Sequence, residues 1–269
     1  MATSAAKFDA HIEQWRQEQA APWHKLKYRQ TAANLAKHLP NQKLHILDAG
    51  GGNGFDALPL AQQGHQVAIV DYSQEMLADA RQRIKATNLE AQIQLYHADV
   101  QEISHLFPNP IFDVVLCHNV LQYVGDIPAL LRHLMTPLRK GGLLSLIGVN
   151  RFARVYMAAF LRNDLVDAMA QIDARTVQGV VFDTPLTNYS VSEIAAMVAA
   201  SDCQIEQDYG LLCVTSYWGD NERKSDPAIY AQLEQLELAL TDKHPYKLLA
   251  SYYQIIAQKV TTLPAARLA

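Results

Sequence analysis

The chain has 269 residues, of which 49% are hydrophobic and 19% charged, and its formal net charge is −4. This length and composition suffice for one large α/β domain or two small ones, and the charge gives no general attraction to a polyanion such as nucleic acid. No apolar run reaches the roughly 18 residues that cross a bilayer, and the first residues lack the apolar core of a secretion signal, so we expect a soluble, cytoplasmic protein.

The three cysteines, Cys117, Cys203 and Cys213, form neither an even disulfide framework nor a paired metal-ligand spacing. We therefore expect buried thiols and no structural metal.

Residues 1–42 are predicted to be a helical N-terminal segment, with an amphipathic helix from Trp23 that ends before Pro40. Lys25 and Arg29 lie four residues apart on one face of this helix. A guanidinium binds a carboxylate in a bidentate manner, so Arg29 is a candidate for pairing with a ligand carboxylate. The alternative is a basic face that only contacts solvent.

An apolar run from Leu44 ends in Asp48 and is followed at once by Gly50, Gly51, Gly52 and Gly54. This pattern predicts a buried parallel strand that leads into a ligand-binding loop and then a helix. Glycine lets the backbone turn sharply and lets a ligand approach closely. The third glycine of the alternating set comes only two residues after the second, which differs from the dinucleotide fingerprint. A purely structural turn is the alternative.

The next predicted strand, residues 65–71, ends in Asp71. An acid at this strand end lies beside the preceding glycine loop and can accept hydrogen bonds from both hydroxyls of a ribose. Asp71 is therefore a candidate ribose ligand, or else a cap for the helix predicted over residues 73–86. Met76 is expected to pack in the core rather than cover a cofactor.

Two further strand ends carry candidate ligands. The third strand ends near Asp99 and Val100, where an acid can accept from an adenine amino group and an apolar neighbour can cover the ring; Asp99 as a helix cap is the alternative. The fourth strand, residues 112–117, leads to His118, which we expect near the ligand unless it is a hydrogen-bonded core histidine.

A helix is predicted over residues 126–142 and a fifth strand over residues 143–150. Five strands that alternate with helices between residues 43 and 150 indicate a doubly wound, mostly parallel sheet with helices on both faces. We interpret 43–150 as the binding core.

Residues 151–201 are predicted to be a largely helical cap that covers the crevice and selects the substrate. Residues 202–269 contain a sixth strand, a helix over 226–243 and a final strand, 252–260, which should complete a seven-stranded sheet with an antiparallel edge.

Together these residues resemble the class I S-adenosylmethionine (SAM)-dependent methyltransferases, a Rossmann-like fold, and within them the bacterial tRNA 5-carboxymethoxyuridine methyltransferase family. The motifs that carry the resemblance are LDAGGGNG, GHQVAIVD, DVQEISHL, VLCHNVLQYV, LRKGGLLSL, YAQLEQLE and SYYQIIAQK. The resemblance implies SAM as the cofactor. The SAM-binding residues that it and the residue pattern suggest are Arg29, Asp48, Gly50, Gly51, Gly52, Gly54, Asp71, Asp99, Val100 and His118.

The resemblance implies methylation of a carboxylate on a modified wobble uridine of tRNA. The family carries an arginine after the glycine of the sixth strand, whereas here Gly210 is followed by Leu211, Leu212, Cys213 and Val214. A small-molecule acceptor therefore stays open as the alternative, and a SAM-binding protein without turnover is a third hypothesis. The basic residues that could line a phosphate path, or else form a solvated rim, are Arg151, Arg154, Arg162, Arg175, Arg223 and Lys224.

The expected mechanism is a single displacement that requires alignment and exclusion of water. A carboxylate acceptor is ionised at pH 7 and needs no general base. A phenol, alcohol or amine would call on a base such as His118, His97 or Tyr123. The sequence assigns no catalytic residue, and it does not indicate the oligomeric state.

Overall fold

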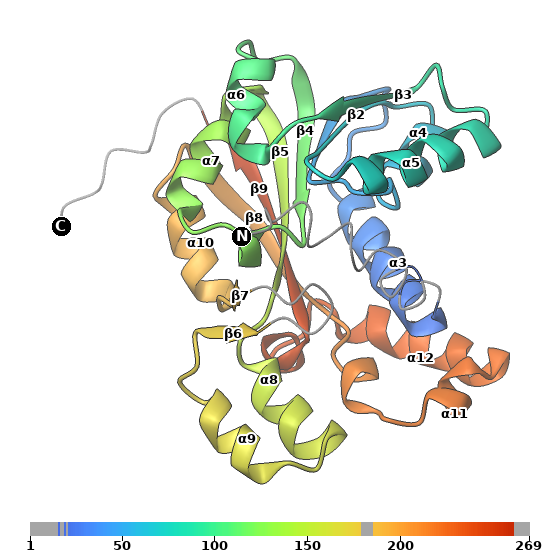
Figure 1. Ribbon diagram of the computed structural model, residues 1–269, viewed down its shortest axis with the longest axis vertical. Helices are drawn as coiled ribbons and strands as arrows, with labels where there is room; N and C mark the ends of the chain where they lie inside the picture. Colours follow the sequence, from blue (N-terminus) through green and yellow to red (C-terminus); the bar gives the residue numbers. More distant parts are fainter. Residues whose placement is uncertain (1–15, 17–18, 20, 179–184, 261–269) are drawn as a thin grey trace.

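The computed structural model describes residues 16, 19, 21–178 and 185–260. Its centre is a seven-stranded sheet of order β3-β2-β1-β4-β5-β9-β8 (Figure 1). The strands are β1 His45–Ala49, β2 Gln66–Asp71, β3 Ile93–His97, β4 Phe112–His118, β5 Leu138–Val149, β8 Cys203–Leu211 and β9 Tyr252–Lys259.

The first five strands pair in parallel, and β9 runs antiparallel to both β5 and β8. The mostly parallel sheet with an antiparallel edge is thus confirmed. Strand β9 lies between β5 and β8 and runs antiparallel to both, so β5 and β8 run in the same direction. Both therefore end at the edge where β1, β2 and β4 end. Segments that leave this carboxyl edge meet there, which is where open α/β sheets bind ligands.

Helices cover both faces of the sheet (Figure 1). One core cluster joins the sheet to Leu35, Leu60 and Leu77, which belong to three helices on one face. The other cluster joins it to apolar residues of helices on the opposite face. The first set of helices is α3 Pro22–Ala36, α4 Ala57–Gln62 and α5 Gln74–Ala86, and the second is α6 Ile103–Leu106, α7 Ile127–Met135 and α10 Val191–Ala199.

Side-chain caps fix where several of these helices begin. Ser73 Oγ accepts from the Met76 amide at 3.1 Å, and Asp126 Oδ1 accepts from the Ala129 amide at 2.8 Å. Ser190 caps α10, and its Oγ accepts from the Glu193 amide at 3.3 Å. Each cap supplies an acceptor to an amide that has no partner within its helix.

Two insertions extend beyond the carboxyl edge (Figure 1). The cap insertion, residues 151–190, follows β5. The return insertion, residues 212–251, connects β8 to β9. The cap insertion contains α8 Ala153–Tyr156, a π-helical turn η3 Met157–Leu161, α9 Leu165–Gln171 and strands β6 Thr176–Gln178 and β7 Pro185–Thr187; the return insertion contains η4 Thr215–Tyr217, α11 Asn221–Ser225, α12 Pro227–Leu240 and η5 Tyr246–Leu249.

The predicted helix over 126–142 was wrong at its C-terminal end. Helix α7 ends at Met135 and β5 already begins at Leu138. Pro137 lacks the amide that would continue the helix, and its ring clashes with the preceding turn. Gly141 and Gly142, at the end of the predicted helix, instead lie in β5, where Gly141 has a φ of +72° and the pairing register with β4 shifts.

The helical part of the cap insertion consists of two stretches, α8 with η3 and then α9. Asn163, with a φ of +53°, separates η3 from α9. The predicted cap is not helical throughout, because it also contains β6 and β7, which pair with each other. The three cysteines are buried and free, as expected. None of the helices in the described part of the chain is both long and apolar enough to span a membrane.

Candidate active site

The glycine loop connects β1 to α4 at the carboxyl edge. Gly50, Gly52 and Gly54 have φ values of +74°, +53° and +80°, which L side chains rarely adopt. A Cβ on Gly50 would lie 2.4 Å from Cγ2 of Val120. The loop therefore keeps its course only with glycine, and it exposes backbone rather than side chains to a neighbouring group.

Asp71 lies directly beside this loop. Its Oδ2 accepts from the Gly52 amide at 2.9 Å and its Oδ1 accepts from the Ser73 amide at 2.8 Å. Ser73, not Asp71, caps α5. Because each carboxylate oxygen can accept more than one hydrogen bond, these contacts fix the carboxylate while leaving acceptor capacity toward a ligand hydroxyl.

Asp48, at the end of β1, is 1% exposed, and its Oδ2 has no hydrogen-bond partner within the described residues. Burial raises the pKa of this carboxyl well above its ordinary value, and the nearby Asp56 and Asp71 carboxylates raise it further. A buried acceptor without a partner is costly. The site thus fits a ligand that brings a cationic or hydrogen-bond-donating group to Asp48.

His118 ends β4 and is 6% exposed. Its Nδ1 is 3.0 Å from Asp56 Oδ2, and its Nε2 is 2.8 Å from Ser145 Oγ of β5. Both ring nitrogens are thus engaged, and the side chain ties the start of α4 to two strands. These hydrogen bonds fit the alternative of a core histidine, and a ligand contact for His118 stays a prediction.

Asp99 and Val100 follow β3. Asp99 is exposed, and its Oδ1 accepts from the Gln101 amide at 2.8 Å, while Glu102 Oε2 accepts from the Asp99 amide at 3.0 Å. Asp99 therefore caps a short helix, η1 Val100–Glu102. Val100 is buried and would contact a Cβ on Gly50 at 3.7 Å, which places it next to the glycine loop.

Arg29 is the one predicted residue that the structure does not bring to the other candidates. Its guanidinium pairs with Glu234 of α12 at 2.5 Å, and its side chain is 59% exposed. Two positions along a helix correspond to a rotation of about 200°, so the residue two before Arg29 faces the opposite way. That residue is Lys27.

Lys27 is 7% exposed, and its Nζ donates to Asn119 Oδ1 at 3.3 Å, directly after His118. The ammonium also lies 4.5 Å from the ring centre of Tyr252. Burial lowers the Lys27 pKa from 10.5 to about 8, and the Asp56 carboxylate partly opposes this shift. Lys27 thus places a buried ammonium at the carboxyl edge, whereas Arg29, the predicted partner of a ligand carboxylate, is paired with Glu234.

Lys27 was missed because the buried face of α3 is largely polar. Gln30, Thr31 and Asn34 are all 3% exposed or less, alongside Leu26. Apolar periodicity is the signal that identifies a buried helix face, and it is weak here. Only the packing of α3 against the sheet and α12 shows which way Lys27 points.

Tyr28, the residue after Lys27 in α3, holds this helix over the glycine loop. The Tyr28 ring stacks on Phe55 with ring centres 4.9 Å apart, and its hydroxyl accepts from Gln19 Nε2 at 3.0 Å. Asn53 Nδ2 donates to Gln19 Oε1 at 2.7 Å. These contacts make the segment before β1 a wall of the site.

The comparisons with known proteins agree with this geometry. A family model described as a methyltransferase domain matches residues 46–142, which contain the glycine loop and the first strand ends. The tRNA 5-carboxymethoxyuridine methyltransferase of Escherichia coli K12 is 30% identical over 220 residues, which are 81% of this chain and 81% of that protein.

The chain belongs to the class I SAM-dependent methyltransferases. Another relative is the ubiquinone biosynthesis O-methyltransferase of Rickettsia akari, 27% identical over 67% of this chain and 66% of that protein. Among solved structures, a SAM-dependent methyltransferase from Thermotoga maritima, a possible histamine N-methyltransferase, has a TM-score of 0.62 at 17% identity and covers 96% of this chain and 100% of that chain. The last similarity supports the Rossmann-like fold.

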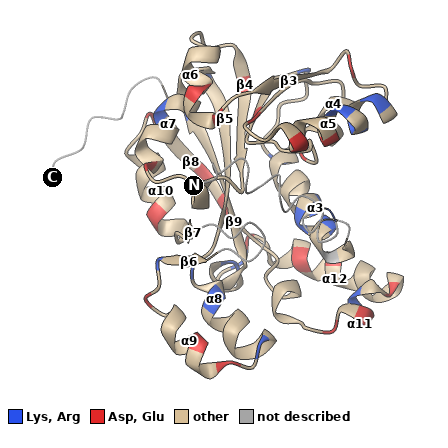
Figure 2. Ribbon diagram, in the orientation of Figure 1, with Lys and Arg blue, Asp and Glu red and all other residues tan. Residues whose placement is uncertain are grey.

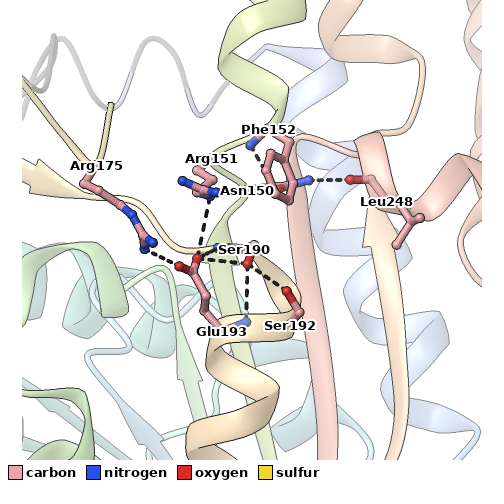
Figure 3. Close-up of polar contacts among 8 residues, drawn as sticks. All are labelled: Asn150, Arg151, Phe152, Arg175, Ser190, Ser192, Glu193 and Leu248. Atoms are coloured by element: carbon pink, nitrogen blue, oxygen red, sulfur yellow. Dashed lines mark hydrogen bonds and ion pairs between the residues drawn. The ribbon is translucent and has the colours of Figure 1, made fainter. Parts of the chain in front are cut away.

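The protein is thus a SAM-dependent enzyme, and its residues fit that cofactor. The glycine loop, the buried Asp48 carboxylate with its unpartnered Oδ2 and the Asp71 carboxylate lie together at the carboxyl edge of the sheet. Three of the four arginines of its cap insertion form ion pairs, which involve two carboxylates. Arg151 and Arg175 both approach Glu193 (Figure 3), and Arg162 pairs with Asp167. Across the cap and return insertions, basic and acidic positions are intermingled (Figure 2).

Proposed function

We propose that this methyltransferase transfers the SAM methyl group to a carboxylate without a side-chain base, and that the acceptor is tRNA 5-carboxymethoxyuridine. The relative from E. coli carries that acceptor in its name and aligns with 81% of the chain, which supports the assignment. The transfer without a side-chain base rests on His118, the histidine at the strand ends, whose two ring nitrogens are engaged by Asp56 and Ser145. An acceptor that is already ionised suits such a site.

In this proposal the nucleoside lies across the carboxyl ends of the first strands. Asp71 accepts from the ribose hydroxyls, and Val100 covers the adenine beside Asp99. The glycine loop lets the ligand approach the backbone, and Asp48 receives the methionine amino group. Lys27 takes the methionine carboxylate, the role predicted for Arg29, because its buried ammonium lies beside Asn119 at this edge.

The chemistry asked of the protein is mainly positional. When bound, SAM supplies a methyl group activated by its sulfonium. An ionised carboxylate would offer a lone pair to that methyl group as the methyl–sulfur bond breaks and the thioether leaves, so no side chain would have to remove a proton. The residues of the site hold both reactants in line and keep water out, and correct alignment alone lowers a barrier of this kind by several kcal/mol, up to about 10.

A small-molecule acceptor is the second candidate, and the state of the cap arginines favours it. Arg151 and Arg175 share the Glu193 carboxylate and Arg162 pairs with Asp167, so two carboxylates offset part of the positive charge that these three side chains could offer to phosphates. Nucleic-acid binding depends on neutralising phosphates with such cations.

A transfer assay separates the two acceptors. Purified enzyme and methyl-labelled SAM are incubated with total tRNA that lacks this methyl ester and, separately, with a metabolite extract. The tRNA proposal predicts label in RNA that mild alkali releases, because an ester hydrolyses and an N- or C-methyl does not. Label found only in small molecules would reject the tRNA acceptor, and label in both fractions resistant to alkali would reject the carboxylate.

A further inference from the structure

Buried side-chain atoms that lack a hydrogen-bond partner gather at the carboxyl edge of the sheet. Among the described residues nine such nitrogen and oxygen atoms occur, and six of them belong to side chains at or just beyond this edge. They are Asp48 Oδ2, Gln122 Oε1, Arg151 Nε, Asn188 Nδ2, Asn188 Oδ1 and Ser251 Oγ. Because an unpartnered buried polar group destabilises a fold, this concentration indicates a place that a polar ligand completes.

Asn188 is the extreme case, because its whole side-chain amide is unpartnered. The residue is 1% exposed, and neither its Nδ2 nor its Oδ1 has a hydrogen-bond partner in the described part of the chain. Its backbone is held in place, since the Asn188 backbone N–H donates to the Arg175 carbonyl at 3.0 Å. The next residue, Tyr189, accepts from the Arg151 backbone N–H at 3.3 Å and pairs with Asn150 at the end of β5. A fixed backbone thus presents one free donor group and one free acceptor.

Contacts along the chain join this segment to the cofactor site. Strand β7 ends at the residue before Asn188 and packs against η2 Leu121–Tyr123, the turn that follows β4. In that turn Gln122 Nε2 donates to the Asn119 carbonyl at 2.7 Å, and the Asn119 side chain accepts from Lys27 Nζ at 3.3 Å. Through η2, the segment that carries Asn188 therefore adjoins the residues around Lys27.

The side-chain amide of Asn188 is complementary to one edge of uracil. Uracil carries its N3–H donor beside the O4 acceptor, and a carboxamide carries an acceptor oxygen beside an N–H donor, so the two can form a pair of parallel hydrogen bonds. A phosphate only accepts hydrogen bonds and would leave the Asn188 oxygen without a partner. An apolar ring would leave both atoms without one.

We propose that Asn188 recognises the target uracil, with its Oδ1 accepting from N3–H and its Nδ2 donating to O4. The inference rests on the proposed function and names the residue that selects its nucleobase. O4 adjoins the ring carbon that bears the carboxymethoxy group, so a residue bound there lies on the side of the base that is methylated. A buried amide that waits for its ligand destabilises the free enzyme, as functional residues often do.

The test compares two synthetic anticodon stem-loop RNAs that differ only at the target base, which is 5-carboxymethoxyuridine or its N3-methyl derivative. N3-methylation removes the donor and leaves the acceptor carboxylate intact. The kcat/KM for methylation is measured for the wild type, Asn188→Leu and Asn188→Ala. Thr176→Val, which changes an exposed residue of β6 in the same hairpin, is the matched control.

The wild type should methylate the uridine RNA about 10- to 100-fold more efficiently than the N3-methyl RNA, the range that one bidentate base contact supplies. In both Asn188 variants this ratio should fall to within about 3-fold through lost activity on the uridine RNA, while the Kd for S-adenosylhomocysteine stays unchanged. Thr176→Val should keep the wild-type ratio. A ratio that persists in both Asn188 variants would overturn the proposal.

Thermal unfolding separates recognition of the base from a structural role. Leucine keeps the branched shape of asparagine and needs no hydrogen-bond partner, so Asn188→Leu should raise the Tm of the free enzyme by about 2–4 °C. A lowered Tm together with equal losses of activity on both RNAs would assign Asn188 to the fold and overturn the proposal.

Failure of the proposed function gives a different result. If the wild type binds S-adenosylhomocysteine but methylates neither RNA, the proposed acceptor is wrong, and the role of Asn188 is rejected with it. If the wild type methylates both RNAs equally well, the proposed function stands and only the recognition of uracil by Asn188 is rejected.

Discussion

Replacing Lys27 with methionine should stabilise the protein without ligand and weaken its binding of SAM. Burial lowers the Lys27 pKa from 10.5 to about 8. Each pKa unit corresponds to about 1.4 kcal/mol, so holding the charged amine in the folded state costs up to roughly 3 kcal/mol at pH 7. Methionine fills similar space without that cost.

The lowered pKa of Lys27 also determines how the stability of the protein changes with pH. Between pH 8 and pH 10.5 the unfolded chain holds a proton on Lys27 that the folded chain has lost, so the stability of the wild type rises with pH across this window. The stability advantage of Lys27→Met is therefore largest at pH 7 and disappears by about pH 10.5. Urea unfolding at several pH values measures it.

Although Lys27→Met should stabilise the free protein, it should weaken SAM binding. A charge-assisted hydrogen bond to a ligand carboxylate contributes about 1.5–3 kcal/mol, so Lys27→Met should raise the Kd for SAM by roughly 10- to 150-fold at pH 7. In the wild type the Kd should also rise above pH 8 as Lys27 loses its proton. Lys27→Arg, which stays charged, should remove that rise. Calorimetric titration at pH 7–9.5 measures each Kd.

Lys25 provides the matched control, since it is an exposed lysine on the same helix, and Lys25→Met should change neither quantity. An unchanged Kd for SAM in Lys27→Met would refute the assignment. If Arg29→Ala weakened SAM binding instead, the carboxylate would belong to Arg29, and the observed pairing of Arg29 with Glu234 would have to break on binding.

Three more substitutions test the site and its support. Asp71→Ala should raise the Kd for SAM at least about 10-fold through loss of hydrogen bonds to a charged acceptor, and unchanged binding would remove Asp71 as the ribose ligand. Gly50→Ala should destabilise the fold by about 1–3 kcal/mol, because the new Cβ meets Val120 at 2.4 Å at a φ of +74°; the added change Val120→Ala should recover part of this in urea unfolding. Glu237→Ala should cost about 3–5 kcal/mol by leaving the buried amides of Cys213, Val214 and Thr215 without an acceptor, and a cost under 1 kcal/mol would show that this loop is held otherwise.

Much of the fold could be predicted from local pattern. The strands that end at Asp48 and Asp71 are short apolar runs followed by loops with glycine or a capping serine, and such signals lie within a few residues of one another. The parallel order and the position of these acids at one edge follow from the alternation of strand and helix.

What the sequence could not supply depends on packing between distant segments. The direction in which Lys27 and Arg29 point is set by Glu234 and Asn119, which are more than 90 residues away. The engagement of both nitrogens of His118 requires Ser145 on a neighbouring strand. No periodicity encodes such pairings, because they arise only when the sheet brings its strand ends together.

The contacts of Tyr217 could not be predicted from local pattern either. Its ring centre lies 6.0 Å from that of Tyr156 in the cap insertion, and its hydroxyl donates to the carbonyl of Leu249. Convergence of two insertions at the carboxyl edge is a property of the sheet order, not of either stretch of sequence.

The decisive experiment is a crystal structure of the enzyme with S-adenosylhomocysteine. We expect the ribose hydroxyls at hydrogen-bond distance, about 3 Å, from the Asp71 carboxylate, and the amino-acid carboxylate of the ligand on Lys27. A nucleoside bound at any other edge of the sheet, or in this edge with Asp71 and Lys27 both out of contact, would contradict it.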